Sequence, residues 1–470
     1  MQNRNLAAIY FFLDFILLKF KFTGSNFNEL KQKIMNRALT HRGEFAFGEP
    51  FGVHHSIKND YIMMKKMNLI ISVIATLIIL SSTDSFSQDW PQFRGSGRDS
   101  KVNGFKAPST WPTDLKQEWK VQVGFGDASP VLTGNKIYLN TRQGNEEVVL
   151  CLEAATGKEL WKYSYTAPAV TGPPASHPGP RSTPAVANGK IVTFGVSAIL
   201  SCLDANTGKV IWKRENPTNV VPQFFTGMSP LIVDNLCIAH VGTKDNGEVI
   251  ALDLNTGNEK WKWAGDGPAY ASPSVMTVDG KKHLIVQTEK NLMALNLTDG
   301  KLLWQVATPV QQRFYNCVSP YIDGQTIYYT GQGTGMKAIK VEKSGNEYVT
   351  KELWSSTEVG AKWNTPVLKD GFLYGFTDQK RIYCLNAATG QTAWIDNAVN
   401  SDFATIVDCG SVLIGLPSTA NLIVLKQVST AYTEVARCKV SETPIYSFPI
   451  VAGNLIYIKD AETLMLYKLN

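Results

Sequence analysis

The chain has 470 residues, a formal net charge of +6, 44% hydrophobic residues and 18% charged residues. Much of the positive excess lies in the first 88 residues. The remainder has no basic stripe interleaved with aromatic side chains, so nucleic acid is not an expected partner. Seven cysteines without a CxxC or CxxCH motif define no disulfide framework, and they argue against a zinc ribbon or covalently attached haem.

The first 88 residues divide into two parts. Residues 63–88 combine the basic pair Lys65 and Lys66, an apolar stretch at 69–80 and a small-x-small cleavage site, Ser-Phe-Ser, at 85–87, which together predict a secretory signal peptide. We expect translation to begin near Met63 and residues 1–62 to be a mis-called upstream extension or disordered; a genuine cytosolic extension is the alternative. No cysteine lies just after the apolar stretch. The sequence therefore predicts an exported protein, periplasmic or secreted, that is not a lipoprotein and has no transmembrane helix in its mature chain.

After a lead-in segment at 89–114, a hairpin unit that ends in tryptophan dominates the chain. An apolar strand leads to an acidic or amide residue, a Thr-Gly or Asp-Gly turn and a second strand, a pattern typical of a β-hairpin. A Ser-Pro, Thr-Pro or Phe-Pro pair precedes most of these hairpins and begins another one. Two hairpins per period give the four antiparallel strands of one propeller blade. The full unit recurs at residues 151–161, 202–212, 251–261, 294–304 and 384–394.

The spacing of the tryptophans gives the number of blades. The outer hairpins end at Trp119, Trp161, Trp212, Trp261, Trp304, Trp354 and Trp394. A weaker unit follows at 403–440, with Val435 near the tryptophan position, and a last unit begins at Pro449 with three strands. We expect the strand around Trp119 to complete it, because this closure removes an open sheet edge. The sequence predicts an all-β, eight-bladed propeller over residues 115–470, with seven blades as the alternative.

Histidine gives no metal-binding or catalytic pattern. His240 is expected to be packed or at a strand edge, and His283 is expected in a solvated hairpin turn. His177 lies in a long Pro/Gly-rich loop at 170–184, a kind of segment that often carries binding residues, so it is a candidate ligand contact. HExxH, GxSxG, P-loop and EF-hand patterns are absent. No catalytic or metal-ligating residue is assigned.

The loops that enter the innermost strands should meet at the mouth of the central channel. Three positions before each marker proline, or before Ile406 in the weak unit, stand Asp127, Arg181, Gly227, Tyr270, Cys317, Trp363, Phe403 and Tyr446. Aromatic groups stack on planar ligands or sugars, and cations bind carboxylates. The alternative is that the aromatics fill the channel and the charges pair together. With the preceding positions, the predicted ligand-binding residues are Asp127, Arg181, Tyr270, Asn316, Lys362, Trp363, Asp402, Phe403 and Tyr446.

The hairpin at 251–261, of the form AxDxxTGxxxW, resembles the tryptophan-docking repeat of the pyrroloquinoline-quinone (PQQ) propeller superfamily. The resemblance covers nearly all of residues 89–470 and implies that the tryptophans dock between neighbouring blades. The stretch DWPQFRGSGRDS at 89–100 is similar to the N-terminal signature of exported PQQ-like propellers of unassigned function. The stretch GPRSTP at 179–184 is similar to the same group.

Two branches of this superfamily imply different functions. Quinoprotein dehydrogenases oxidise alcohols or sugars with PQQ and Ca²⁺, and the resemblance would place Arg181, Lys362, Asp127 and Trp363 at the cofactor. They commonly carry adjacent cysteines there, and this chain has no Cys-Cys pair. The other branch is non-catalytic and includes the propeller lipoprotein of the outer-membrane β-barrel assembly machine. We expect a binding or scaffold protein that takes a protein partner, a small molecule or a glycan, with a PQQ- and Ca-dependent dehydrogenase as the alternative.

Overall fold

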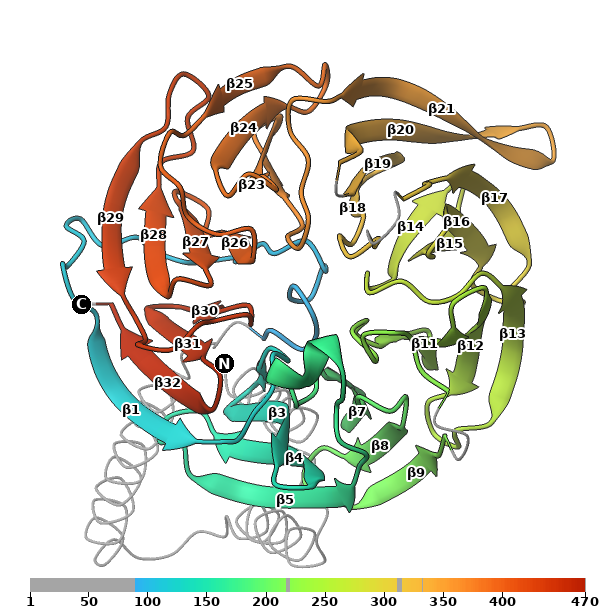
Figure 1. Ribbon diagram of the computed structural model, residues 1–470, viewed down its shortest axis with the longest axis horizontal. Coiled ribbons are helices and arrows are strands. Elements are labelled where there is room, and N and C mark those ends of the chain that lie inside the picture. Colours follow the sequence, from blue (N-terminus) through green and yellow to red (C-terminus); the bar gives the residue numbers. More distant parts are fainter. Residues whose placement is uncertain (1–88, 217–219, 311–314, 332, 470) are drawn as a thin grey trace, which may run out of the picture. The chain divides into compact units, whose positions relative to one another are not determined.

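The computed structural model describes residues 89–216, 220–310, 315–331 and 333–469. The expected signal peptide and the extension at 1–62 lie outside these residues. Eight four-stranded antiparallel sheets surround a central channel (Figure 1). The prediction of eight blades is confirmed, and the alternative of seven is wrong. The one helix of the described part is the single 3-10 turn η1 (Pro173–Ser176), and no helix there has the length and apolarity to span a membrane.

Seven blades are each built from four consecutive strands, ordered from the channel outward. The first four are β2 (Val131–Thr133), β3 (Lys136–Gln143), β4 (Glu146–Glu153), β5 (Glu159–Thr166); β6 (Ala185–Ala187), β7 (Lys190–Phe194), β8 (Leu200–Asp204), β9 (Val210–Arg214); β10 (Leu231–Val233), β11 (Leu236–Thr243), β12 (Asn246–Asp253), β13 (Glu259–Gly265); and β14 (Ser274–Val278), β15 (Lys281–Gln287), β16 (Asn291–Asn296), β17 (Leu302–Ala307). The next three are β18 (Tyr321–Asp323), β19 (Thr326–Gly331), β20 (Gly335–Ser344), β21 (Glu347–Ser356); β22 (Val367–Lys369), β23 (Phe372–Phe376), β24 (Ile382–Asn386), β25 (Thr392–Ile395); and β26 (Ala404–Asp408), β27 (Leu413–Pro417), β28 (Asn421–Leu425), β29 (Glu434–Lys439).

The eighth blade joins segments from both ends of the described chain. Its inner strands are β30 (Ile450–Ala452), β31 (Leu455–Lys459) and β32 (Thr463–Lys468), and its outermost strand is β1 (Lys116–Gln122). The antiparallel pairing of β1 with β32 closes the ring, as the sequence predicts. Each pair of neighbouring blades shares a hydrophobic layer, so the core is distributed around the ring.

The repeated tryptophans fix each blade against the next. The Trp261 indole N–H donates to the Leu297 carbonyl of the following blade at 2.9 Å. The ring lies against Gly300 in the next turn, where an added Cβ would stand 2.4 Å from Trp261. Gly300 has φ +72°, a conformation that glycine adopts without steric cost. The same donation to the next blade is made by Trp161 to Ala205, Trp212 to Leu254 and Trp354 to Ala387.

One interface departs from this pattern because the blade after Trp304 has a long turn without the docking glycine. The Trp304 indole instead donates to His283 Nδ1 at 3.2 Å, and the Tyr348 ring of the elongated β20–β21 hairpin packs edge-on against His283 at 4.3 Å. His283 is fully buried. The prediction of a solvated His283 is therefore wrong: the turn is Asp279-Gly280, and His283 already belongs to β15. His240 is buried in β11, in agreement with a packed role.

The weak unit at 403–440 forms a complete blade, β26 to β29. Ala436 stands opposite Val424, the register position that tryptophan holds in the regular blades. The preceding Trp394 still docks, since its indole donates to the Val428 carbonyl at 3.0 Å. Tyr432 packs against the Trp394 ring at 5.7 Å. An aromatic contact thus replaces the turn glycine at this interface.

The N-terminal segment 89–102, which we term the lead-in plug, crosses the channel (Figure 1). Trp90 exchanges two backbone hydrogen bonds with Leu132 of β2. The Arg94 and Arg98 side chains donate to backbone carbonyls of distant blades, Arg94 to Pro366 at 3.0 Å and Arg98 to Pro230 at 3.3 Å. The plug therefore ties several blades together from inside the ring.

A pair of glycine substitutions tests the docking contact. Gly300→Ala and Gly189→Ala impose the same positive φ on alanine, +72° and +71°, but only Gly300 faces an indole; nothing lies within 4 Å of a Cβ at Gly189. Both variants should lose about 1–2 kcal/mol of unfolding free energy from backbone strain. Gly300→Ala should lose about 1–3 kcal/mol more from overpacking against Trp261. Denaturant unfolding checks this, and equal losses in the two variants would contradict it.

Candidate functional site

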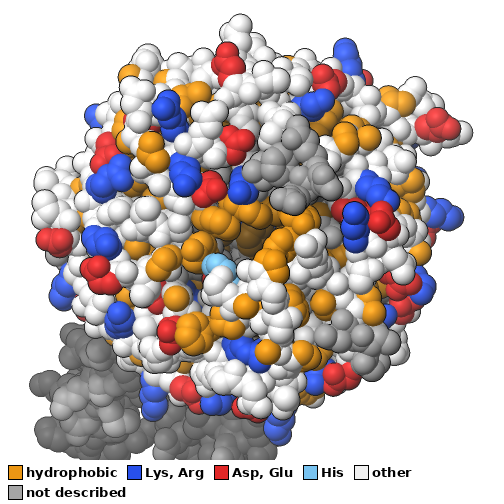
Figure 2. Space-filling model, in the orientation of Figure 1, with side chains coloured by type: hydrophobic (Ala, Val, Ile, Leu, Met, Phe, Trp, Pro, Cys, Tyr) orange, Lys and Arg blue, Asp and Glu red, His pale blue; other side chains and the backbone are white. Residues whose placement is uncertain are grey.

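The inner-strand loops of all eight blades line one cavity of about 560 Å³ at the channel mouth. Figure 2 shows the corresponding hollow in the centre of one face, bordered by hydrophobic side chains. The lining includes every residue that sequence reasoning placed three positions before a marker proline: Asp127, Arg181, Gly227, Tyr270, Cys317, Trp363, Phe403 and Tyr446. Propeller symmetry brings these residues together, because each occupies the same position in its own blade.

The structure places the other three candidates differently. Lys362 lines the cavity, and its ammonium lies 5.0 Å from the centre of the Trp363 ring. Asp402 is not among the residues that line the cavity, and its carboxylate pairs with the Lys362 ammonium at 3.8 Å. Asn316 is buried outside this cavity, where its amide donates to the carbonyls of Thr288 and Thr308 at 3.2 Å. Asn316 therefore holds two loops in place beside the mouth.

Two groups of aromatic rings form the rim. On one side Trp363 stacks on Phe403, with centroids 4.8 Å apart and planes 9° apart, and Phe403 meets the edge of Tyr446 at 5.2 Å. On the other side Phe224 lies edge-on to Tyr270 and Tyr315, at 6.1 and 4.9 Å. The rings line the cavity and leave it open, so the mouth offers flat apolar walls. Edge-to-face and stacked contacts of this kind hold ring positions well.

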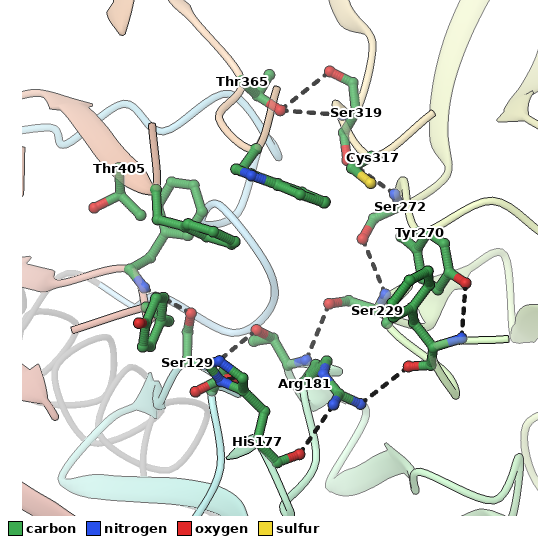
Figure 3. Close-up of a pocket in the computed structure, with 18 of the residues that line it drawn as sticks. Ser129, His177, Arg181, Ser229, Tyr270, Ser272, Cys317, Ser319, Thr365 and Thr405 are labelled. Atoms are coloured by element: carbon green, nitrogen blue, oxygen red, sulfur yellow. Dashed lines mark hydrogen bonds and ion pairs between the residues drawn. The ribbon is translucent and has the colours of Figure 1, made fainter. Parts of the chain in front are cut away.

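The 170–184 loop supplies the polar side of the mouth. His177, at the end of η1, contacts the Asp127 carboxylate through Nδ1 at 2.7 Å. Arg181 donates to the carbonyls of His177 and Phe224 at 2.9 and 3.2 Å, which fixes the loop against the neighbouring blade (Figure 3). The hydrogen bond to Asp127 raises the pKa of His177 above its ordinary value, and burial lowers the pKa of Arg181.

Below the mouth, one hydroxyl side chain from each of seven blades lines the cavity, and we call this set the hydroxyl belt. Its members are Ser129, Thr183, Ser229, Ser272, Ser319, Thr365 and Thr405. The backbone N–H of one member donates to the hydroxyl oxygen of the next at 2.8–3.2 Å, from Ser129 round to Thr365, as Figure 3 shows for Ser229 and Ser272. Phe448 takes the belt position in the eighth blade and donates its N–H to Ser129.

The belt has a break at blade seven. Thr405 Oγ1 is buried and has no hydrogen-bond partner among the described residues. The marker proline is replaced there by Ile406, which continues the strand β26. The hydrogen bonds missing from the belt are thus those of the blade whose sequence departs most from the repeat.

The lead-in plug closes the deep end of the cavity. Phe93 lines the cavity and meets the edge of Phe448 at 5.2 Å. Arg98 lies behind Phe93, with its guanidinium carbon 5.7 Å from the ring centre. Since Phe448 belongs to the belt level, the plug sits directly beneath the belt and makes the cavity a blind well.

Sequence reasoning missed several lining residues. Phe224 and Tyr315 lie in loops outside the repeat, so no periodic signal marks them. The belt was visible as the Ser or Thr before each marker proline, but the sequence treats these pairs only as blade boundaries. Phe93 lies inside the DWPQFRGSGRDS stretch, whose place in the channel could not be deduced from residue spacing.

The mouth does not offer the ligands for a calcium ion. Among the described residues no three His, Cys, Asp or Glu side chains gather in a metal-binding arrangement. Calcium takes six to eight oxygen ligands, usually including carboxylates. The two carboxylates present are already engaged: Asp127 contacts His177, and Asp402 pairs with Lys362. Arg181 and the aromatic walls suit a planar carboxylate such as PQQ, but the calcium that accompanies it in the dehydrogenase branch does not fit.

Comparison with known proteins is consistent with this architecture. Residues 145–396 match the model of the family described as outer membrane protein assembly factor BamB, whose members are PQQ-repeat propellers. The chain belongs to this family. The match runs from the outer strands of the first blade through the sixth blade and ends before the seventh, so membership rests on the repeats and says nothing of the lead-in plug.

Individual relatives are distant. The chain is 22% identical to the outer membrane protein assembly factor BamB of Yersinia pestis over 346 residues, 71% of the chain and 81% of that protein. It is 27% identical to a tetrathionate hydrolase of Acidithiobacillus ferrooxidans over 49% of the chain, and so spans about half (46%) of that protein. A europium-containing methanol dehydrogenase superposes with TM-score 0.64 at 13% identity, over 81% of the chain and 98% of that structure. This last likeness shows the fold alone.

Histidine titration tests the pair at the mouth. His177 should titrate above its ordinary pKa of 6.5, whereas burial lowers the pKa of His240 and His283 to about 4. Asp127→Asn should lower the pKa of His177, and Asp402→Asn should not.

The raised pKa of His177 also makes stability depend on pH. The folded state holds the His177 proton more tightly than the unfolded chain does, so this stabilisation is present at low pH and is lost as pH rises through the raised pKa. NMR of the histidine ring protons measures each value; an unshifted His177 in Asp127→Asn would contradict the assignment.

Proposed function

We propose that this protein is an exported, non-catalytic binding propeller that takes its ligand at the channel mouth. The observation that carries the proposal is the convergence of one loop residue from each of eight blades on a single blind well. Concave sites with apolar walls and a few fixed polar groups are the usual form of small-ligand sites. The well of about 560 Å³ has the size of such a site.

The structure of the rim favours binding over catalysis. Arg181 and Lys362 offer positive charge beside flat aromatic walls, which suits a planar or sugar-like ligand with an acceptor group. The polar groups are held by one another, and none forms a nucleophile–base pair: His177 contacts a carboxylate, and Lys362 pairs with Asp402. Export is proposed from the sequence at 63–88.

A protein partner is the second candidate occupant of this face. The family match and the Yersinia pestis relative, an outer membrane assembly factor by name, motivate it. A partner would present an aromatic or acceptor-bearing side chain to the same well. A small-molecule ligand and a protein partner would therefore be recognised by the same groups of the well.

A neutral aromatic probe tests the mouth. 2-Naphthamide should bind one-to-one with a dissociation constant in the roughly millimolar range expected of a fragment of its size. Trp363→Ala should weaken binding about two- to tenfold, because one stacking wall is lost. Tyr432→Ala, which removes an aromatic that packs on Trp394 away from the cavity, is the matched control. Ligand-detected NMR measures the affinities, and equal binding by both variants would contradict the assigned site.

PQQ distinguishes the dehydrogenase alternative. If the mouth is a binding site without calcium ligands, adding Ca²⁺ or a chelator should leave the affinity for PQQ unchanged. The PQQ-loaded protein should not reduce a dye acceptor in the presence of alcohols or sugars. Tryptophan fluorescence and dye reduction give the two readouts. Tight calcium-dependent binding together with dye reduction would overturn the non-catalytic proposal.

A further inference from the structure

Two guanidinium groups lie buried beneath the well without a counter-charge in contact. Arg94 is 1% and Arg98 is 6% exposed. Their hydrogen bonds go to neutral acceptors: Arg94 to Ser100 Oγ and the Pro366 carbonyl, and Arg98 to Gln92 Oε1 and the carbonyls of the 229–230 segment. Arg98 Nε has no partner among the described residues.

Both groups nevertheless remain charged at neutral pH. Burial lowers the pKa of Arg94 to about 10, and burial together with the nearby Arg94 charge lowers the pKa of Arg98 to about 9. Tyr321 and, to a smaller extent, the Asp99 carboxylate raise the Arg94 pKa through space, but Arg94 donates its hydrogen bonds in the described structure to Ser100 and Pro366 and not to Asp99. Charged side chains are rarely buried unless they are paired. The two buried guanidinium groups donate hydrogen bonds only to neutral acceptors, and Asp99 is one negative charge for two positive ones, so the site favours a further anion nearby.

Both arginines are hydrogen-bonded to the backbone next to residues of the hydroxyl belt. Arg98 holds the Pro230 carbonyl, next to belt residue Ser229, and Arg94 holds the Pro366 carbonyl, next to belt residue Thr365. Six belt hydroxyls accept a backbone N–H. Thr365 donates its own O–H to the Ser319 carbonyl, and the O–H groups of the other five have no acceptor within the described part of the chain. These five are Ser129, Thr183, Ser229, Ser272 and Ser319. Their O–H groups are free to donate to a bound group in the well.

We propose that the deep end of the well binds a single carboxylate-type oxyanion, held by the O–H groups of the hydroxyl belt in the positive field of Arg94 and Arg98. The inference rests on the proposed function and specifies its ligand: an aromatic or apolar body that fills the mouth and an anionic group that points toward the plug. Hydroxyl donors reach the carboxylate directly, and the guanidinium groups act through the low-dielectric floor behind Phe93.

A matched pair of probes tests this on the unmodified protein. 2-Naphthoate and 2-naphthamide have the same ring system and nearly the same shape, but at neutral pH only the naphthoate is charged. Naphthoate should bind at least about tenfold more tightly, the difference expected for hydrogen bonds to a charged group. Equal affinities would overturn the oxyanion inference and leave the aromatic mouth intact. Absence of binding by either probe would overturn the proposed function as well.

Variants identify the groups responsible. Arg98→Met should remove the preference for naphthoate and leave naphthamide binding unchanged. The control is Arg214→Met, because Arg214 of β9 forms an exposed ion pair with Glu259 and lies outside the cavity lining; this variant should change neither affinity. If Arg98→Met does not fold, Ser272→Ala gives a second test. It removes one O–H donor and should weaken naphthoate about three- to tenfold, and naphthamide less, because the neutral amide oxygen accepts a weaker hydrogen bond. A preference that survives unchanged in the folded variants would overturn the assignment to the belt and plug.

Discussion

The contact on which the whole molecule depends is the seating of an indole from one blade against the turn of the next. A propeller blade is a twisted four-stranded sheet with two apolar faces, and it is stable only when both faces are covered. The tryptophan covers the outer part of this interface and, through its N–H, also satisfies a backbone carbonyl of the neighbour. Where the turn glycine is absent, an aromatic ring of the next blade packs at the interface instead, Tyr348 against His283 and Tyr432 against Trp394.

Because the blades are arranged in a ring, equivalent positions of the eight blades meet at its centre. The inner-loop residue of each blade thereby becomes one of eight that together form the wall of the well. The aromatic rim and the hydroxyl belt are two successive levels of this wall, and the plug is the floor beneath them. Their chemistry changes from flat and apolar, to hydroxylic, to positively charged. The ordering of these levels gives the well a direction, which a ligand with one polar end can match.

Much of this was available from the sequence because the repeat fixes register. The spacing of the tryptophans gave eight blades, and the marker prolines located the residues of the mouth such as Arg181 and Trp363. Features that depend on contacts between non-repeating segments could not be predicted from the sequence. Tyr315 and Phe224 meet only through folding of separate loops, and the burial of Arg94 and Arg98 follows from a segment threading the channel. His283 was misplaced because it lies in β15, beyond the Asp279-Gly280 turn, and because its partner Tyr348 comes from the atypical, elongated β20–β21 hairpin.

The break in the hydroxyl belt has a mechanical consequence. Around the ring each inner loop is linked to the next by a backbone N–H and a hydroxyl, except on the two sides of Thr405. The plug crosses this joint, because Asp408 of β26 exchanges backbone hydrogen bonds with Ser100 and Val102. Local opening of a protein begins where the fewest bonds must be broken. Blade seven is thus the place where we expect the ring to open first, and the backbone hydrogen bonds of the lead-in segment to β26 hold the ring closed there.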